Sequence, residues 1–310
     1  MTSAIVFAYH NVGVRCLSVL LDRGIRVPLV LTHLDDPKEE IWFESVAELA
    51  QRYGISVITP LDPNTSEVVE QVKSLQPDFL FSFYYRSLLK PEILNLAKRG
   101  ALNMHGSLLP KYRGRAPVNW AIIKGEVETG ATLHYMTEKP DSGDIVDQQA
   151  VPILSNDTAV EVFNKVTVAA ELVLNRNITA LVEDKVNRRP QDFMKSSYYG
   201  GRRPKDGRIN WHADAITIHN LVRGVASPYP GALTTLENVP ARVLKTVLLN
   251  GESGKKQRSS MPGLYVQDNN FFADCGDGGV IRILKFELDG KMLSPRDFLK
   301  LYGDKKVDLE

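Results

Sequence analysis

Short apolar runs rich in β-branched residues alternate with helical patterns through the first third of the chain, and this alternation limits the possible folds most. The predicted strands cover residues 4–9, 27–33, 55–59, 79–83 and 101–105. The predicted helices between them cover residues 14–22, 43–53, 68–75 and 91–97. Strands joined by helices in this way form right-handed βαβ units on a parallel sheet. We therefore expect a doubly wound, Rossmann-like α/β domain.

The turn after the first predicted strand argues against a dinucleotide cofactor. Residues 9–14 read Tyr-His-Asn-Val-Gly-Val and hold one glycine, whereas the dinucleotide fingerprint needs three to let a pyrophosphate approach the backbone. The sequence also lacks a glycine-rich loop that ends in Gly-Lys-Ser or Gly-Lys-Thr. We expect neither NAD nor FAD, and no P-loop nucleotide site.

The pattern changes after residue 125. Segments 131–136 and 145–153 favour strands added antiparallel to the sheet, and 158–183 favours a long amphipathic helix that follows an Asn156-Asp157 cap and closes the first domain. Residues 188–207, rich in Gly, Pro and charge, are typical of a linker or an active-site flap.

The remainder of the chain favours strands. One short helix at 215–225 precedes predicted strands at 231–235, 241–248, 263–267 and 280–286, with turns between them. We expect a Rossmann-like domain over residues 1–203 and a small OB-like β-barrel domain over residues 204–310.

The composition excludes several classes of protein. Hydrophobic residues make up 43% and charged residues 24% of the 310 residues, which excludes a disordered or fibrous protein. No apolar stretch approaches the roughly 20 residues that cross a bilayer, and the first nine residues favour an opening strand rather than a signal peptide. We expect a cytoplasmic protein without membrane insertion. The 38 Lys and Arg against 37 Asp and Glu argue against nucleic-acid binding and favour a small-molecule substrate.

The chain shows no pattern typical of a metal site or a disulfide framework. Its two cysteines, Cys16 and Cys275, lie far apart in the sequence. Neither a His-x-x-x-His nor a Cys-x-x-Cys pair is present. We expect no metal and no disulfide.

The strongest chemical signal begins in the fifth predicted strand and reads Asn103-Met-His-Gly-Ser-Leu-Leu-Pro-Lys-Tyr-Arg-Gly-Arg-Ala-Pro-Val-Asn-Trp120. Open α/β sheets bind ligands at the carboxyl ends of their strands. Asn103 and His105 are two residues apart on a strand, so their side chains point to the same face. An Asn amide can stabilise an oxyanion, and an imidazole can move a proton between an amine and a leaving group. The pair predicts acyl transfer, and the irregular run after it predicts a binding loop.

A turn over residues 139–144, Lys-Pro-Asp-Ser-Gly-Asp, places a carboxylate between two predicted strands. If this turn folds back beside His105, Asp141 orients the imidazole and fixes its tautomer, as the acid of a catalytic triad does. Asp144 in the same turn is the alternative. Taken alone, an Asp-Ser-Gly turn is usually only a turn.

Aromatic and polar residues near the predicted crevice are candidates for substrate contacts. His10 and Asn11 occupy the first strand-to-helix turn, and we expect them to reach the substrate. In the aromatic run 81–85 we expect the two phenylalanines in the core, with Tyr84 and Tyr85 at the edge of the pocket.

These motifs together resemble the folate-dependent formyltransferases, which use 10-formyltetrahydrofolate. The resemblance rests on Asn103-x-His105 followed by Ser-Leu-Leu-Pro-x-Tyr-Arg-Gly-x-x-Pro117, and on the Asp141 turn. Segments 7–10, 81–86, 105–115, 129–134 and 227–232 resemble more narrowly the formyltransferase unit of the UDP-4-amino-4-deoxy-L-arabinose (lipid A modification) pathway, and the resemblance extends over nearly the whole chain. In the best-known member this unit is fused to a UDP-glucuronate decarboxylase, for which 310 residues leave no room. We expect a stand-alone formyltransferase.

The resemblance implies that the Rossmann-like domain carries folate and catalysis, that a barrel-like domain follows, and that no metal is needed. It assigns the catalytic roles to Asn103, His105 and Asp141. The amine of a UDP-linked aminosugar attacks the formyl carbon, Asn103 steadies the oxyanion, and His105 protonates the departing folate nitrogen. The implied folate contacts are Ser87, Leu88, Leu89, Arg115, Thr137, Glu138, Lys139, Pro140 and Asp141.

Two basic clusters are candidates for contact with phosphate. Arg202 and Arg203 are hypothesised to hold the pyrophosphate of the UDP-sugar. The cluster Lys255-Lys-Gln-Arg258 is a second candidate. Short basic clusters are, however, more often solvated loops.

Other reactions on the same three residues stay open. The acceptor could be another nucleotide-linked aminosugar, such as a dTDP-4-amino-4,6-dideoxyhexose. Methionyl-tRNA would require a tRNA-binding surface, which the balanced charge does not favour. A formyltetrahydrofolate hydrolase would pass the formyl group to water. The sequence does not predict the oligomeric state.

Overall fold

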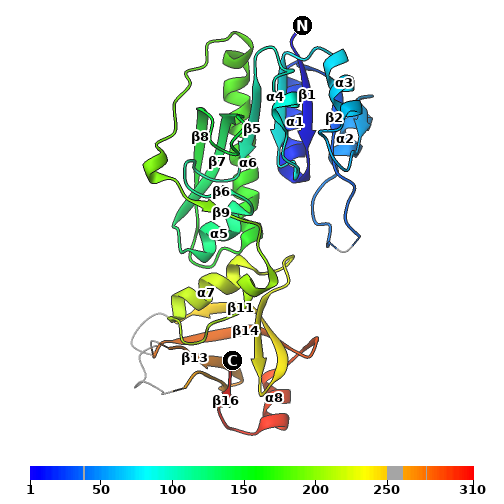
Figure 1. Ribbon diagram of the computed structural model, residues 1–310. Helices are drawn as coiled ribbons and strands as arrows, with labels where there is room; N and C mark the ends of the chain where they lie inside the picture. Colours follow the sequence, from blue (N-terminus) through cyan, green and yellow to red (C-terminus); the bar gives the residue numbers. More distant parts are fainter. Residues whose placement is uncertain (38, 250–260, 277) are drawn as a thin grey trace. The chain divides into compact units, whose positions relative to one another are not determined.

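The computed structural model describes residues 1–37, 39–249, 261–276 and 278–310 (Figure 1). The chain divides into two compact units. Unit 1 comprises Met1–Pro117, Glu128–Pro152 and Phe163–Gly200, and unit 2 comprises Val118–Val127, Ile153–Val162 and Gly201–Glu310. Two short segments from the middle of the chain thus belong with the C-terminal unit. The basic cluster at 255–258 lies outside the described residues.

Unit 1 is built on a seven-stranded sheet in the order β3-β2-β1-β4-β5-β7-β8. The first five strands are parallel, and β7 and β8 continue the sheet antiparallel. This confirms the predicted doubly wound sheet and its antiparallel addition. The bounds are β1 (Ser3–Ala8), β2 (Arg26–Leu31), β3 (Ser56–Ile58), β4 (Phe79–Phe83), β5 (Ala101–His105), β7 (Glu128–Tyr135) and β8 (Ile145–Pro152).

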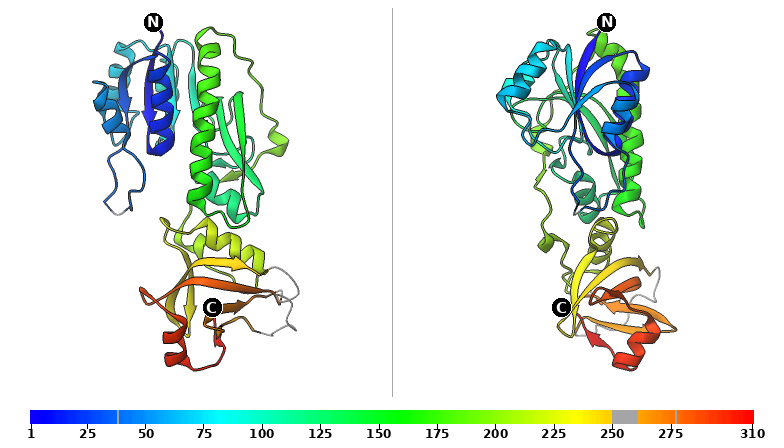
Figure 2. Two further views of the ribbon diagram at one scale, coloured as in Figure 1. Left: turned by 180° about the vertical axis from the view of Figure 1, so that it is seen from behind. Right: turned by 90° about the vertical axis from the view of Figure 1, so that its right-hand side faces the viewer.

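Helices cover both faces of this sheet, which explains why every residue of β4 is buried. One face carries α1 (His10–Asp22), α2 (Val46–Arg52) and much of α6 (Ala159–Val182); Figure 2 shows α1 (blue) and α6 (green) in front of the sheet in the view from behind. A bidentate ion pair between Arg15 and Glu171 joins α1 to α6. On the other face α3 (Ser66–Ser74) and α4 (Pro91–Leu94) cover a core that includes Ile5, Phe7 and Leu80.

The structure corrects two predictions, the start of helix α6 and the end of the loop after β5. Helix α6 begins after Thr158, not after an Asn156-Asp157 cap, because Glu161 accepts from the backbone N–H and the hydroxyl of Thr158 at 2.6 and 2.8 Å, as in a capping box. The loop predicted after His105 ends earlier than expected, because α5 (Pro117–Ile123) starts with a proline, which suits the first turn of a helix.

Unit 2 contains a sheet in the order β10-β11-β14-β13-β12-β16, with β15 beside β14. The first and last strands approach each other, since Leu236 forms a bridge with Leu309 and Thr235 exchanges two backbone hydrogen bonds with Glu310. The result is a nearly closed antiparallel barrel, which confirms the predicted fold. Its strands are β10 (Ala232–Leu236), β11 (Val239–Leu248), β12 (Gly263–Gln267), β13 (Asn270–Asp274), β14 (Val280–Leu288), β15 (Lys291–Met292) and β16 (Val307–Asp308).

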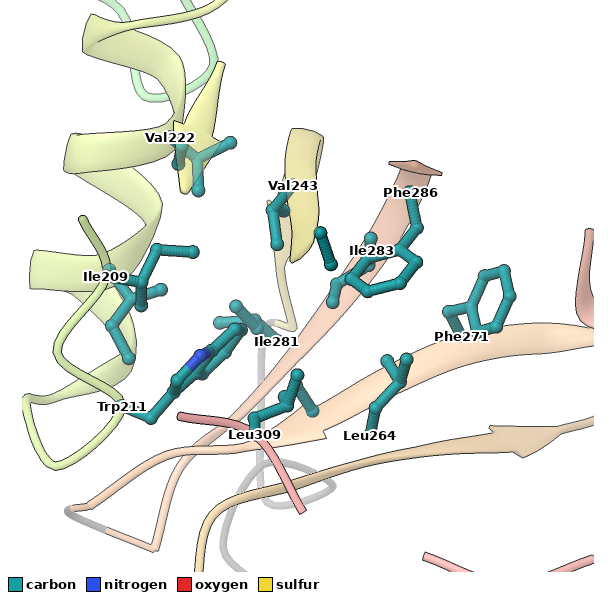
Figure 3. Packing of buried hydrophobic residues seen from close by; sticks show 14 of the residues in the cluster. Ile209, Trp211, Val222, Val243, Leu264, Phe271, Ile281, Ile283, Phe286 and Leu309 are labelled. Atoms are coloured by element: carbon teal, nitrogen blue, oxygen red, sulfur yellow. The ribbon is translucent and has the colours of Figure 1, made fainter. Parts of the chain in front are cut away.

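Alternating side chains fill the barrel, and α7 (Ala215–Gly224) packs against β11. Figure 3 shows Trp211, Val243 and Phe286 among the residues of this core. The buried indole N–H of Trp211 donates to the hydroxyl of Thr234 at 2.7 Å, so the ring brings no unpaired donor into the core.

The expectation that strands alone follow residue 225 was wrong. The helix α8 (Pro295–Tyr302) has an ordinary start signal: Ser294 accepts from the backbone N–H of Asp297 at 3.1 Å, and Pro295 is the first helical residue. Strand β13 was also missed. In the part of the chain that the structure describes, no helix has both the length and the apolar character to cross a bilayer.

Candidate active site

The candidate site lies at the carboxyl end of β5, next to the point where the strand order of the sheet reverses. The crossovers from β1 and from β4 run to opposite sides of the sheet, and open α/β sheets bind ligands beyond the carboxyl ends of strands at such a point. His10 follows β1, Tyr84 follows β4, and His105 ends β5. The parallel strands therefore bring three distant segments of the sequence to one edge.

The turn between β7 and β8 folds back beside His105, as predicted for Asp141. Oδ1 of Asp141 lies 3.5 Å from Nδ1 of His105, and both side chains are about nine-tenths buried. The other carboxylate oxygen accepts from the backbone N–H of Gly114 at 2.9 Å. The side chain of Asp144 is exposed, so of the two carboxylates considered it is Asp141 that meets the imidazole.

Asn103 lies on the same face of the sheet, where it contacts a second histidine. Its register partner on β7 is His134, and Nδ2 of Asn103 lies 3.2 Å from Nε2 of His134. Nδ1 of His134 lies 2.8 Å from the carbonyl oxygen of Tyr135. His134 was not among the predicted site residues. Its signal in the sequence is its position on a predicted strand opposite the Asn-x-His pair.

Burial and charge set the protonation of this cluster. Burial lowers the pKa of His134 to about 4, although the nearby Asp141 carboxylate acts in the opposite direction. Burial alone would raise the pKa of Asp141, but His105, His134 and the Gly114 N–H together hold it below its ordinary value. His134 is thus neutral and Asp141 ionised at neutral pH.

The loop after β5 is held by hydrogen bonds to side chains on β7 and β8. Thr132 donates to the carbonyl of Ser107 at 2.6 Å, and Gln148 donates to the carbonyl of Leu109 at 2.8 Å. Further along, β6 (Arg113–Gly114) pairs with β9 (Tyr198–Tyr199) in the connector after α6. The carbonyl of Tyr112 accepts from Nε2 of His105 at 2.8 Å. The binding loop is therefore rigidly tied to the imidazole that it surrounds.

The predicted folate contacts come from two loops and one arginine. Leu88 is exposed, whereas Leu89 is buried and packs in the core, so of these two leucines only Leu88 is open to a ligand. Arg115 donates to the carbonyl of Arg86 at 3.0 Å, which ties it to the loop that holds Ser87. In the turn 137–141, the hydroxyl of Thr137 donates to the carbonyl of Lys139 at 3.0 Å. Glu138 and Pro140 are exposed in the same turn.

The predicted substrate contacts at the first turn lie in an aromatic cluster. The ring of His10 stacks on Phe43 at 4.0 Å between centroids, and Phe163 lies 4.4 Å away. Burial lowers the pKa of His10 to about 3, so its ring is neutral. A Cβ at Gly106 would overlap the Tyr84 hydroxyl, so this glycine makes room for Tyr84 next to His105. A cavity of about 410 Å³ opens beside the cluster and is lined by Asn11, Arg15, Ile41, Trp42, Phe43, Glu44 and Thr167.

Arg202 and Arg203 belong to unit 2. The guanidinium of Arg202 lies 4.9 Å from the centre of the Tyr229 ring, and the backbone N–H of Arg203 donates to Asp206 at 2.6 Å. The contact of these arginines with pyrophosphate stays a prediction. Across the described residues, no group of three His, Cys, Asp or Glu side chains is placed to hold a metal ion.

Three solved structures that are named as formyltransferases are similar to this chain. The structure of the N-formyltransferase from Helicobacter canadensis, in complex with folinic acid and dTDP-3-aminofucose, matches with a TM-score of 0.73 and 24% identity over 93% of this chain and 100% of that one. WlaRD, a sugar 3N-formyl transferase in the presence of dTDP and 5-N-formyl-THF, matches with a TM-score of 0.72 and 22% identity over 94% and 99%. A sugar N-formyltransferase from a Shewanella species matches with a TM-score of 0.60 and 20% identity, over 75% of this chain and 92% of that one.

The sequence itself matches two family models. The model described as formyl transferase covers residues 24–178, which is 155 of the 310 residues, and that of the formyl transferase C-terminal domain covers residues 202–303. The prediction of a formyltransferase is thereby confirmed, and the chain belongs to the formyl transferase family.

Proposed function

We propose that this formyltransferase moves the formyl group of 10-formyltetrahydrofolate to the 4-amino group of a UDP-linked aminosugar, UDP-4-amino-4-deoxy-L-arabinose. The observation that carries the reaction is the convergence of Asn103, His105 and Asp141 at the carboxyl end of β5. The folate donor is supported by the turn 137–141 and by the folates named in the two related structures. The UDP-sugar is supported by the motifs that resemble the arabinose pathway.

Asn103 is the proposed oxyanion donor. When the acceptor amine attacks the formyl carbon, negative charge develops on the formyl oxygen, and a fixed N–H near that oxygen lowers the barrier by about 3 kcal/mol. The Asn103 amide carries two N–H groups, of which one is directed at Nε2 of His134. We assign the other N–H to the oxyanion.

His105 is the proposed proton carrier. The attacking amine loses one proton, which His105 takes up and passes to the folate nitrogen as the bond between that nitrogen and the formyl carbon breaks, and tetrahydrofolate leaves. Nε2 of His105 points at the carbonyl of Tyr112, so in the reaction it exchanges this partner for the leaving nitrogen. Asp141, on the other side of the ring, stabilises the protonated imidazole and holds its orientation.

A dTDP-linked aminosugar is the second candidate acceptor. Two related structures contain dTDP or a dTDP-aminosugar, and they align over more than nine-tenths of this chain. Both candidates share the amine, the pyrophosphate and a pyrimidine nucleotide. We assign the acceptor to the cavity beside Asn11 and Trp42, because its aromatic wall and polar rim suit a sugar nucleotide.

The test offers UDP-4-amino-4-deoxy-L-arabinose, dTDP-aminohexoses and methionyl-tRNA side by side with 10-formyltetrahydrofolate and follows tetrahydrofolate by absorbance. Wild type is compared with H105A and D141N, and D144N is the matched control because Asp144 is an exposed carboxylate of the same turn. We expect turnover of the UDP-pentose alone, a loss of at least about 100-fold in H105A and D141N, and wild-type rates in D144N.

Other outcomes correct the proposal in defined ways. Turnover of a dTDP-sugar alone would keep the mechanism and change the acceptor. Tetrahydrofolate release without any amine would identify a hydrolase, and equal losses in D141N and D144N would remove Asp141 from the mechanism.

A further inference from the structure

Gln191 lies in the connector after α6 and joins the two loops that flank His105. The residue is 7% exposed. Nε2 donates to the backbone carbonyls of Asp141 at 3.0 Å and of Gly143 at 2.7 Å. Oε1 accepts from the guanidinium of Arg113 at 2.8 Å. Both the donor and the acceptor end of this buried amide are therefore in use.

The Asp141 turn depends on support from outside itself. Asp141 has a φ of 53°, in the left-handed region that side chains rarely adopt. Gly143 lies so close to Tyr135 that a Cβ would overlap the Tyr135 carbonyl. Gln191 binds the carbonyls on both sides of residue 142 and so fixes the segment between them. Arg189 exchanges two backbone hydrogen bonds with Ile145 and brings the connector alongside the turn.

Through its side-chain oxygen, Gln191 also holds the loop after β5. Arg113, its partner, precedes Gly114, whose N–H donates to the Asp141 carboxylate. The residue before Arg113 is Tyr112, whose carbonyl accepts from His105. One side chain thus links the backbone of the Asp141 turn to the loop that contacts both members of the His–Asp pair.

We propose that Gln191 is a positioning residue for formyl transfer, which holds the Asp141 carboxylate in place beside His105. The inference rests on the proposed function, since Gln191 acts in the same reaction. A shift of about 1 Å in a catalytic group can cost about 100-fold in rate, so the loss of these hydrogen bonds has a measurable effect on kcat. The effect must pass through Asp141.

The test is a double-mutant cycle on kcat with Q191A, D141N and the double variant. We expect Q191A to lower kcat about 10- to 100-fold in the wild-type background and less than about twofold in D141N, with little change in the acceptor KM. Q191E is the second variant: it keeps the partner of Arg113 and the side-chain volume but lacks both N–H donors, and we expect it to lose activity as Q191A does. The matched control is D192A: Asp192 takes part in none of these bonds and instead accepts from the Met194 N–H and pairs with Lys195 within its own short 3-10 turn. Wild-type kcat is expected.

The cycle separates positioning from simple structural support. Equal losses from Q191A in both backgrounds, or a lower Tm with wild-type kcat, would overturn the role of Gln191 while the proposed function stands. Wild-type protein that transfers no formyl group to any acceptor would overturn the proposed function and this inference together.

Discussion

Nε2 of His134 lies 3.2 Å from Nδ2 of Asn103, and the carbonyl of Tyr135 lies 2.8 Å from the other nitrogen of the His134 ring. A carbonyl can only accept, so Nδ1 of His134 carries the proton and Nε2 accepts from the Asn103 amide. A backbone carbonyl on β7 thereby determines which way the amide of Asn103 faces. The proposed oxyanion donor is oriented before substrate arrives.

Removal of the His134 ring, which accepts a hydrogen bond from Asn103, should slow the reaction without weakening the binding of the aminosugar. In H134L the Asn103 amide loses the partner that orients it, and we expect kcat to fall about tenfold with the acceptor KM unchanged. In H134Q the side-chain carbonyl can accept from Asn103, so part of the rate should return. Steady-state kinetics on both variants check this, and equal rates for H134L and H134Q would contradict it.

Stability should fall in mild acid because buried histidines must stay neutral. Burial lowers the pKa of His134 to about 4, of His10 to about 3 and of His33 to about 4, against about 6.5 in the unfolded chain. Between pH 6.5 and 4 the unfolded chain binds more protons, so the free energy of unfolding decreases as the pH falls. The stability that these neutral histidines contribute is fully present above pH 6.5 and is lost as the pH falls towards 4. Urea unfolding at pH 7.5, 5.5 and 4.5 measures it, and a smaller slope is expected in H134Q.

Gly106 should not tolerate a side chain. A Cβ there would overlap the Tyr84 hydroxyl, so in G106A the tyrosine must move beside His105. We expect about 1–3 kcal/mol of destabilisation and a kcat lower by about tenfold. G200A is the matched control, since nothing lies within 4 Å of an added Cβ at that position. Thermal unfolding and initial rates test the pair, and similar values for both variants would show that the site repacks freely.

Two adjacent phenylalanines on β13 should differ in their effect on stability. Phe271 is 3% exposed in the barrel core, whereas Phe272 is half-buried on the other face of the strand. We expect F271A to cost about 3–5 kcal/mol and F272A less than half as much. Chemical denaturation of unit 2 within the full chain provides the measurement. Equal losses of unfolding free energy in the two variants would mean that successive side chains of β13 do not point alternately into and out of the barrel.

Strands that are buried on both faces were predictable, because the apolar residues that this burial requires are visible in the sequence. Strands β4 and β5 have the predicted bounds of 79–83 and 101–105, since central strands of a parallel sheet are buried on both faces and are therefore rich in apolar residues. Helix α8 and strand β13 were missed because their local sequence pattern is weak. Each is short, and its apolar residues gain their stability from the barrel core rather than from local propensity.

The sequence alone determined the alternation of strands and helices up to β5, the Asn-x-His motif and the family, because these depend on residue type and spacing along the chain. The turn itself left Asp144 as an alternative to Asp141, and the resemblance to the formyltransferases assigned the role to Asp141. Only the tertiary structure shows Asp141, and not Asp144, beside His105, and it adds the contacts of His134 and Gln191, which lie 31 and 88 residues from Asn103. Those choices rest on hydrogen bonds between segments distant in sequence, whose geometry exists only once β5, β7 and the connector are packed together.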